Sequence, residues 1–187
     1  MNGEQLDFQR FVYIMLNKPK GVVSATNDKN EKTVIDLVPK EFKGRNLFPA
    51  GRLDITTTGF VLVTDDGDFA HRILSPKNHI EKTYEARLAE SVTEGQLEAV
   101  RNGIGLKDGT KCLPAKVTVL ADGEKPLVEI KICEGKYHQI KRMFAAAGNG
   151  VIELKRTQMG RLTLDPSLKE GECRLLDAHE VQKIEKG

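Results

Sequence analysis

The 187-residue sequence predicts an α+β fold, in which helices pack against a central, mostly antiparallel mixed sheet. Three observations support this prediction. Strand-like and helix-like segments follow one another in an irregular order. Two strand-like segments, 115–120 and 127–132, flank Asp122-Gly123, which is a typical hairpin signal. The chain has no internal repeat and no compositional break, so we interpret it as one domain, of one or two lobes, that can bury a sizeable core.

The first part of the chain is predicted to contain two buried strands and two short helices. The strands are placed at 11–16 and 60–63, and the helices at 34–38 and 69–74. The first strand is expected to stop at the turn cluster 17–21, which combines Asn, Lys, Pro and Gly. Thr33 and Asp68 precede the two helices and are predicted to be their N-caps, because both side chains can accept hydrogen bonds from free backbone N–H groups.

The second part of the chain is predicted to contain five strands and three helices. The strands are placed at 82–88, 115–120, 127–132, 151–154 and 162–164, and the helices at 94–102, at 137–147 and near the C-terminus. Two of these helices begin with capping boxes, Thr93 with Gln96 and Asp177 with Glu180. The helix 137–147 carries apolar residues at helical spacing, which predicts one buried face.

The composition is that of an ordinary globular protein, with 39% hydrophobic and 30% charged residues. No apolar run is long enough to cross a bilayer, and the N-terminus lacks the apolar core of a signal peptide. The cysteines, Cys112, Cys133 and Cys173, are widely spaced and odd in number, so we do not expect a disulfide framework. These features favour a reducing cytoplasm as the location.

Positive charge is concentrated between residues 131 and 161, although the net charge of the whole chain is only +2. The acidic residues of this segment are Glu134 and Glu153. The basic residues are Lys131, Lys136, Lys141, Arg142, Lys155, Arg156 and Arg161. Such a local excess suits a polyanion such as nucleic acid, and the alternative interpretation is a solvated charged face.

Metal, nucleotide and acyl-transfer chemistry are disfavoured. His71 and His79 are eight residues apart, and no cysteine or histidine pair has the close spacing of a zinc site. The segment 65–68 has some similarity to a calcium loop, but no glutamate stands at the closing position. The sequence also lacks a phosphate-binding loop ending in GK[ST], a dinucleotide glycine fingerprint and a nucleophile elbow.

The polar loop 51–59 is the first of three segments that could carry chemistry. It begins at Gly51, presents Arg52 and Asp54, and closes at Gly59 into an apolar strand. The two glycines give the backbone conformational freedom at both ends of the loop, and functional residues concentrate on loops held by a rigid scaffold. Taken alone, Asp54 has an ordinary alternative role as a turn or cap residue.

The other two segments lie later in the chain. Residues 81–84, with the sequence EKTY, start a strand, and residues 134–143 lead into the basic helix. In that helix His138, Lys141 and Arg142 are spaced to share one face. Each segment has an ordinary structural explanation, because a tyrosine on a strand is commonly part of the core and a lysine on a helix is commonly solvated.

In this order the three segments resemble the pseudouridine synthases, in particular the branch of ribosomal small-subunit enzymes that modify one uridine of 16S rRNA. The phrase GRLDITTTGFVLVTDDG is similar to the catalytic motif of that family, and KTYEARL to the motif that supplies the active-site tyrosine. EGKYHQIKRMFAAAGN resembles the third motif of the family, and NKPKGVVSA resembles the first. The resemblance runs from about Tyr13 to Leu176, and four motifs in the right order make it highly specific.

The resemblance implies roles for individual residues. Asp54 would be the catalytic carboxylate, and Tyr84 would pack under the target uracil and is a candidate acid–base group. Lys141 would pair with Asp54 and keep it ionised, since a nearby cation favours the charged form of a partly buried carboxylate. Arg52 would fill the space left by the displaced nucleotide. The other implied substrate-binding residues are Ile140, which would line the base pocket, and His138, Gln139 and Arg142.

The resemblance also implies an architecture and a partner. The sheet would be built in two halves with the catalytic cleft between them, and no cofactor or metal would be needed. Residues 1–10 would be an N-terminal extension, and residues 11–187 the catalytic domain with two subdomains. The partner would be 16S rRNA in a pre-ribosomal particle, bound by a monomer. Enzymes of this branch usually carry a small S4-type RNA-binding domain, whereas only about ten residues precede the first predicted strand.

Several alternatives stay open at this point. The target could be 23S rRNA, or the chain could be a non-catalytic RNA-binding or ribosome-assembly module on the same scaffold. A carboxylate-dependent hydrolase is a more remote reading, because no second acid is placed for it. The chain could be a catalytic domain that naturally lacks an S4-type domain, or a truncated form of a longer protein. Asp54 could attack the ribose as a nucleophile or remove a ribose proton as a base.

Overall fold

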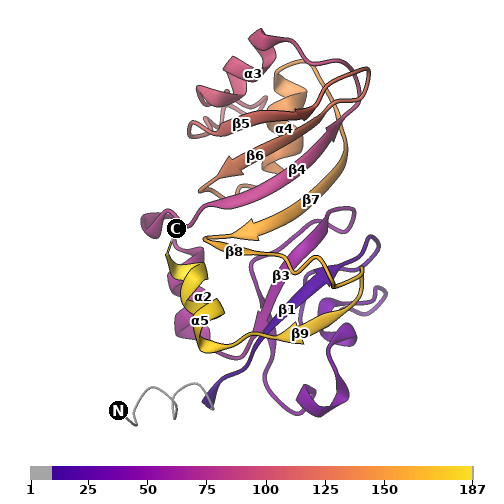
Figure 1. The fold of residues 1–187 in the computed structure, drawn as a ribbon, viewed down its shortest axis with the longest axis vertical. Helices are drawn as coiled ribbons and strands as arrows, with labels where there is room; N and C mark the ends of the chain where they lie inside the picture. Colours follow the sequence, from indigo (N-terminus) through magenta and orange to yellow (C-terminus); the bar gives the residue numbers. More distant parts are fainter. Residues whose placement is uncertain (1–9, 187) are drawn as a thin grey trace. The chain divides into compact units, whose positions relative to one another are not determined.

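The computed structural model describes residues 10–186, which form two compact units (Figure 1). The first unit contains the chain up to Ile80 and again from Gln158, and the second unit is Glu81–Thr157. The second unit is therefore inserted, along the chain, between two parts of the first. Apart from its last residue, the predicted N-terminal extension lies outside the described residues.

An antiparallel sheet forms the centre of the first unit. Strand β1 (Tyr13–Lys18) pairs antiparallel with β3 (Thr58–Thr64), in a register that places Ile14 opposite Val63. Every residue of both strands is buried, which explains why their sequences show little polar alternation. The smaller strands are β2 (Phe48–Ala50) beside β3, β9 (Cys173–Leu175) beside β1, and β8 (Leu162–Thr163) beside the end of β7.

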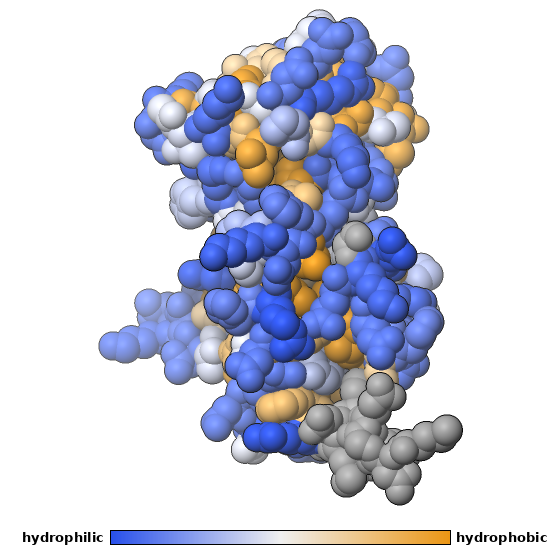
Figure 2. Space-filling view, turned by 90° about the vertical axis from the view of Figure 1, so that its left-hand side faces the viewer, coloured by the Kyte–Doolittle hydropathy of each residue, from blue (hydrophilic) through white to orange (hydrophobic). Residues whose placement is uncertain are grey.

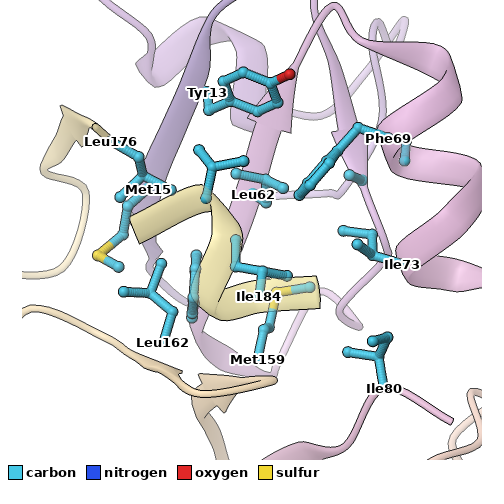
Figure 3. Packing of buried hydrophobic residues seen from close by; sticks show 14 of the residues in the cluster. Tyr13, Met15, Leu62, Phe69, Ile73, Ile80, Met159, Leu162, Leu176 and Ile184 are labelled. Atoms are coloured by element: carbon cyan, nitrogen blue, oxygen red, sulfur yellow. The ribbon is translucent and has the colours of Figure 1, made fainter. Parts of the chain in front are cut away.

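The core of the first unit is shared by this sheet and two helices, α2 (Gly67–Leu74) and α5 (Ala178–Glu185). Alternate residues of a strand point to the same face of a sheet. Met15 of β1 and Leu62 of β3 therefore meet Phe69 of α2 and Ile184 of α5 in one cluster (Figure 3).

Helix α2 is capped by Asp66, so the predicted cap at Asp68 is wrong. One carboxylate oxygen of Asp66 accepts a hydrogen bond from the backbone N–H of Phe69 at 3.0 Å. The other accepts a hydrogen bond from the hydroxyl of Tyr13 at 2.5 Å. Burial and this bond raise the pKa of the Tyr13 phenol above its ordinary value. Asp66 and Asp68 both fit the sequence preference for an N-cap residue. The hydrogen bond from Tyr13 of β1 favours Asp66.

The strands of the second unit pair in the order β5-β6-β4-β7, and β6 is antiparallel to both β5 and β4. These strands are β4 (Lys82–Leu88), β5 (Lys116–Ala121), β6 (Leu127–Ile132) and β7 (Val151–Met159), whose last two residues belong to the first unit. The hairpin between β5 and β6 contains the predicted Asp122-Gly123 turn. Its helices are α3 (Glu94–Arg101) and α4 (Gln139–Ala146).

The predicted α+β class is confirmed, and so are several local features. The bounds of β4 and β6 are those predicted, and capping boxes begin α3 at Thr93 and α5 at Asp177. Thr33 also forms a capping box, but it begins a 3-10 helix, Val34–Leu37, and not an α-helix.

Other boundaries differ from the prediction because tertiary contacts override local patterns. Strand β1 continues through Asn17 and Lys18, for which the sequence predicts a turn. The Asn17 side-chain amide nitrogen donates to the carbonyl of Leu168 at 2.9 Å, and this distant partner favours the buried strand over a local turn. The predicted helix 137–147 begins only at Gln139, because His138 has a left-handed backbone. Strands β2 and β9 were not predicted, and β7 is longer than predicted.

Within residues 10–186, no helix combines the length and the apolar character that crossing a membrane requires. Figure 2 shows that the face turned to the viewer is covered mainly by hydrophilic residues, with smaller hydrophobic areas between them. The three cysteines are free thiols, as expected from their spacing.

A pair of glycine substitutions tests the packing of the turn between β7 and β8 against α5. A Cβ atom at Gly160 (φ +56°) would lie 2.1 Å from the backbone oxygen of Ile184, whereas a Cβ at Gly171 (φ +89°) would meet nothing within 4 Å. Gly171→Ala should cost about 1–2 kcal/mol of unfolding free energy, from left-handed strain alone. Gly160→Ala should cost at least ~2 kcal/mol more, because backbone has to move. Urea unfolding measures both values, and equal losses would contradict this packing.

Candidate active site

The Asp54 loop connects β2 to β3 and closes as a tight turn, in which the N–H of Thr57 donates to the carbonyl of Asp54 at 3.0 Å. Gly51 (φ +98°) and Gly59 (φ +104°) both have the positive φ that favours glycine, as the sequence predicted for the two ends of this loop. The Asp54 side chain is half-buried and Arg52 is exposed. The loop therefore presents one partly shielded carboxylate and one accessible guanidinium.

Lys18 ties this loop to the sheet, although its sequence context predicted only a turn. Its ammonium donates to the carbonyl oxygens of Thr57 at 2.8 Å, Pro19 at 2.9 Å and Ile55 at 3.3 Å. The residue is 0% exposed. A buried ammonium is costly unless acceptors surround it, so these carbonyls are held in place by the need to satisfy the charge. The conformation of the Asp54 loop is thereby coupled to the end of β1.

The segment that follows Lys18 completes the support of the loop. The N–H of Gly21 donates to the carbonyl of Ile55 at 2.9 Å, and the N–H of Leu53 donates to the hydroxyl of Ser24 at 3.1 Å. Ser24 and Leu53 are both buried. Residues 18–24 thus contact the backbone on both sides of Asp54, which gives a physical role to the motif NKPKGVVSA.

Tyr84 lies on β4 in the second unit, where it is buried beside an arginine that the sequence reasoning missed. The guanidinium of Arg156, on β7, donates to the Tyr84 hydroxyl at 3.4 Å and lies 6.0 Å from the centre of the ring. Arg156 is only 2% exposed, so it does not belong to the solvated phosphate-binding surface predicted for residues 131–161. Its strand position between polar residues gave no signal of burial.

Lys82 is a second buried cation on the same face of β4 as Tyr84, two residues earlier. Burial, together with repulsion by Arg156, lowers the pKa of the Lys82 ammonium. This face of the second unit therefore combines a tyrosine hydroxyl with two cationic side chains. Such a combination suits a negatively charged group better than a neutral one.

The third segment enters α4, where Gln139 and Ile140 are buried and Lys141 and Arg142 are half-buried. Because His138 precedes the helix with φ +47°, the predicted helix face shared by His138, Lys141 and Arg142 is not formed.

Glu134 organises the approach to this helix. It accepts hydrogen bonds from the side chains of Lys136 and Gln139 and, at 2.9 Å, from the N–H of Leu113. Burial alone would raise the pKa of Glu134, but these bonds lower it.

The structure divides the predicted site residues between the two units. Arg52 and Asp54 share one loop of the first unit. The second unit holds Tyr84, His138, Gln139, Ile140, Lys141 and Arg142. The pairing of Asp54 with Lys141 therefore stays a prediction. No group of three or more His, Cys, Asp or Glu side chains that could hold a metal ion is found among residues 10–186.

Comparison with protein families gives a match to the model for RNA pseudouridylate synthases over residues 12–146. A ribosomal small subunit pseudouridine synthase A of Haemophilus influenzae is 48% identical over 177 residues, which cover 93% of this chain and 74% of that protein. The Escherichia coli (strain K12) protein of the same name is 45% identical, over 92% of this chain and 73% of its own length. An uncharacterised RNA pseudouridine synthase of Bacillus subtilis is 45% identical, over 97% of this chain and 77% of that protein.

Solved structures agree with the sequence relatives. A crystal structure of a pseudouridylate synthase superposes with a TM-score of 0.86 at 45% identity, covering 93% of this chain and 74% of that one. A subunit of an archaeal box H/ACA Nop10-Cbf5 complex superposes with a TM-score of 0.61 at 20% identity, which shows a common fold.

Replacing Lys18 tests its hold on the loop. Lys18→Met should lower the free energy of unfolding by about 2–4 kcal/mol, because buried carbonyls lose a charged donor. The amides of Gly21 and Thr57 should also exchange with deuterium faster, since their acceptors lie in the loop that Lys18 holds. Lys20→Met removes an exposed lysine from the same turn and should change neither property. Equal exchange in the two variants would contradict the role of Lys18.

Proposed function

The chain belongs to the RNA pseudouridylate synthase family, and from this premise we propose that it converts a uridine of small-subunit (16S) rRNA into pseudouridine, with Asp54 as the catalytic carboxylate. The observation that carries this proposal is the identity of 45–48% over more than nine-tenths of the chain with enzymes named for the ribosomal small subunit. We assign the small ribosomal subunit as the target of this chain from that similarity alone.

The reaction explains which groups the site requires. The bond between uracil N1 and ribose C1′ breaks, the base turns, and a bond forms between C5 and C1′. C5 loses its proton and N1 gains one, so the product is an isomer of the substrate and no atom is supplied from outside. A carboxylate is required to attack the ribose or to remove a ribose proton, and both routes are compatible with a half-buried Asp54.

Three further residues have roles in this proposal. Lys141 pairs with Asp54 and favours its charged form. Tyr84 supplies a flat surface for the flipped uracil, and base–aromatic stacking is worth about 1–3 kcal/mol. Its hydroxyl is held by Arg156, which supports a fixed orientation of the ring. Arg52 is exposed on the same loop as Asp54, which supports its role of filling the space that the displaced nucleotide leaves.

Chemistry on a base requires that the base leave its stack, at a cost of a few kcal/mol. We propose that Ile140, His138, Gln139 and Arg142 contribute to RNA binding. The free energy of this binding offsets the cost of flipping the base. The buried Ile140 is suited to line an apolar pocket, and the half-buried Arg142 to contact phosphate. The proposed partner is rRNA in a pre-ribosomal particle, and we expect a monomer. Three free thiols support the expected location in a reducing cytoplasm.

Substitution of Asp54 tests the proposed chemistry. Asp54→Asn should abolish tritium release from rRNA labelled at C5 of uridine, because an amide neither attacks ribose nor accepts its proton. RNA binding should persist, since the shape of the side chain is kept. Asp68→Asn, an exposed carboxylate in the same unit, should keep full activity. Full activity of Asp54→Asn would refute the role of Asp54, and a wild-type protein that binds RNA without releasing tritium would indicate a non-catalytic module.

Mapping of pseudouridine in rRNA tests the proposed target. Cells that lack this gene should lose one pseudouridine signal in 16S rRNA, and the signal should return when the wild-type gene is supplied. The Asp54→Asn gene should fail to restore it. A signal lost only from 23S rRNA would refute the choice of the small subunit while leaving the reaction class intact.

A further inference from the structure

Tyr137 is the most exposed of the large apolar side chains in the described part of the chain, with 75% of its surface accessible. Its ring stacks on the neighbouring ring of His138, with 3.8 Å between the ring centres and an angle of 15° between the planes. The two rings therefore form a flat aromatic surface, one side of which is open to solvent. We call Tyr137 and His138 the aromatic pair.

The backbone around the aromatic pair is held by hydrogen bonds. His138 has a left-handed conformation, which turns the chain sharply into α4. The guanidinium of Arg142 donates to the carbonyl of Tyr137 at 3.1 Å, and the N–H of Gln139 donates to the carbonyl of Lys136 at 3.1 Å. The exposed ring is consequently presented on an ordered turn, so that binding there would cost little ordering entropy.

The charges near the aromatic pair are mostly positive. Arg142 also bonds Asp108 at 2.5 Å, which brings the loop containing Lys107 to α4. The cations of this region are Lys107, Lys136, Lys141 and Arg142, and its carboxylates are Asp108 and Glu134. Asp108 pairs with Arg142 and Glu134 with Lys136, so the four cations and two carboxylates leave a net charge of +2. The surroundings therefore suit a ligand that joins a flat apolar face to negative charge.

We propose that the aromatic pair is a stacking platform for an unpaired nucleobase of the RNA substrate, distinct from the target uridine. This proposal rests on the proposed function, because it takes the ligand to be RNA. A nucleobase has a π-face that stacks on tyrosine, and the phosphates on either side of it meet the surrounding cations. The platform accepts any base, so it contributes affinity and holds the strand, while other contacts select the target.

Substitutions of Tyr137 separate stacking from charge. In binding to a small-subunit rRNA transcript, Tyr137→Leu should raise Kd by about 5- to 150-fold, the range for one base–aromatic stack, and Tyr137→Phe should stay within about twofold. The slope of log Kd against log salt concentration should be unchanged in Tyr137→Leu, because no phosphate contact is lost. Lys107→Ala should instead reduce that slope by about 0.7–0.9, as expected for one lost contact.

A spectroscopic measurement reports the stack directly. The chain has three tyrosines, so protein labelled with 13C in tyrosine rings gives few signals, and the Tyr137→Phe spectrum identifies those of Tyr137. Addition of a short single-stranded RNA of mixed sequence should shift the Tyr137 ring protons upfield. Unmoved Tyr137 signals on a protein that binds this RNA would overturn the proposal, and so would an unchanged Kd in Tyr137→Leu.

The two proposals fail in different ways. A wild-type protein that releases no tritium, but binds RNA with the Tyr137 signals shifted, would refute the catalytic function and keep the platform. An active wild-type protein whose Tyr137→Leu variant binds and reacts equally well would refute the platform and keep the catalytic function. Equal melting temperatures of the wild type and Tyr137→Leu, expected for an exposed ring, ensure that either result reports on binding.

Discussion

A buried lysine ammonium, held by three backbone carbonyls, is the interaction on which the first unit depends. Lys18 ends β1, and the acceptors Ile55 and Thr57 lie in the loop that carries Asp54. Removing an ammonium from water costs several kcal/mol, which only a full set of acceptors offsets. The loop therefore cannot change conformation without leaving a charge unsatisfied inside the protein. The same interaction therefore fixes the end of β1 beside β3 and the position of the Asp54 carboxylate.

Much of the fold follows from patterns along the chain, because those patterns report local hydrogen bonding and burial. The alternation in β4 and the two capping boxes predicted their elements correctly. Errors arose where a partner far away in the sequence decided the outcome. Asn17 and Lys18 look like turn residues until Leu168 and the Asp54 loop supply their hydrogen bonds. Strand β9 is short and half-exposed, and it forms because β1 offers it an edge.

The parts of the candidate site that could be predicted are those whose residues lie in contiguous sequence motifs. Asp54, its flanking glycines and the tyrosine of KTYEARL could be selected from the sequence, and the structure adds the supports around them. Arg156 could not be selected, because a charged residue on a strand looks the same in sequence whether it faces water or a buried hydroxyl. Lys82 was missed for the same reason. Only the pairing of β7 beside β4 shows that their side chains share one face.

The insertion of one unit within the other has a consequence for the growing polypeptide. All four strands of the second unit lie before residue 160, so they are synthesised before the segment that completes the core of the first unit. The first unit must wait, since Leu162, Leu176 and Ile184 of its core follow the second unit in the chain. Nascent chains thus carry β1 and β3 with part of their apolar surface uncovered until this later segment has been synthesised. The unit that bears Asp54 therefore begins before the other unit and is completed after it.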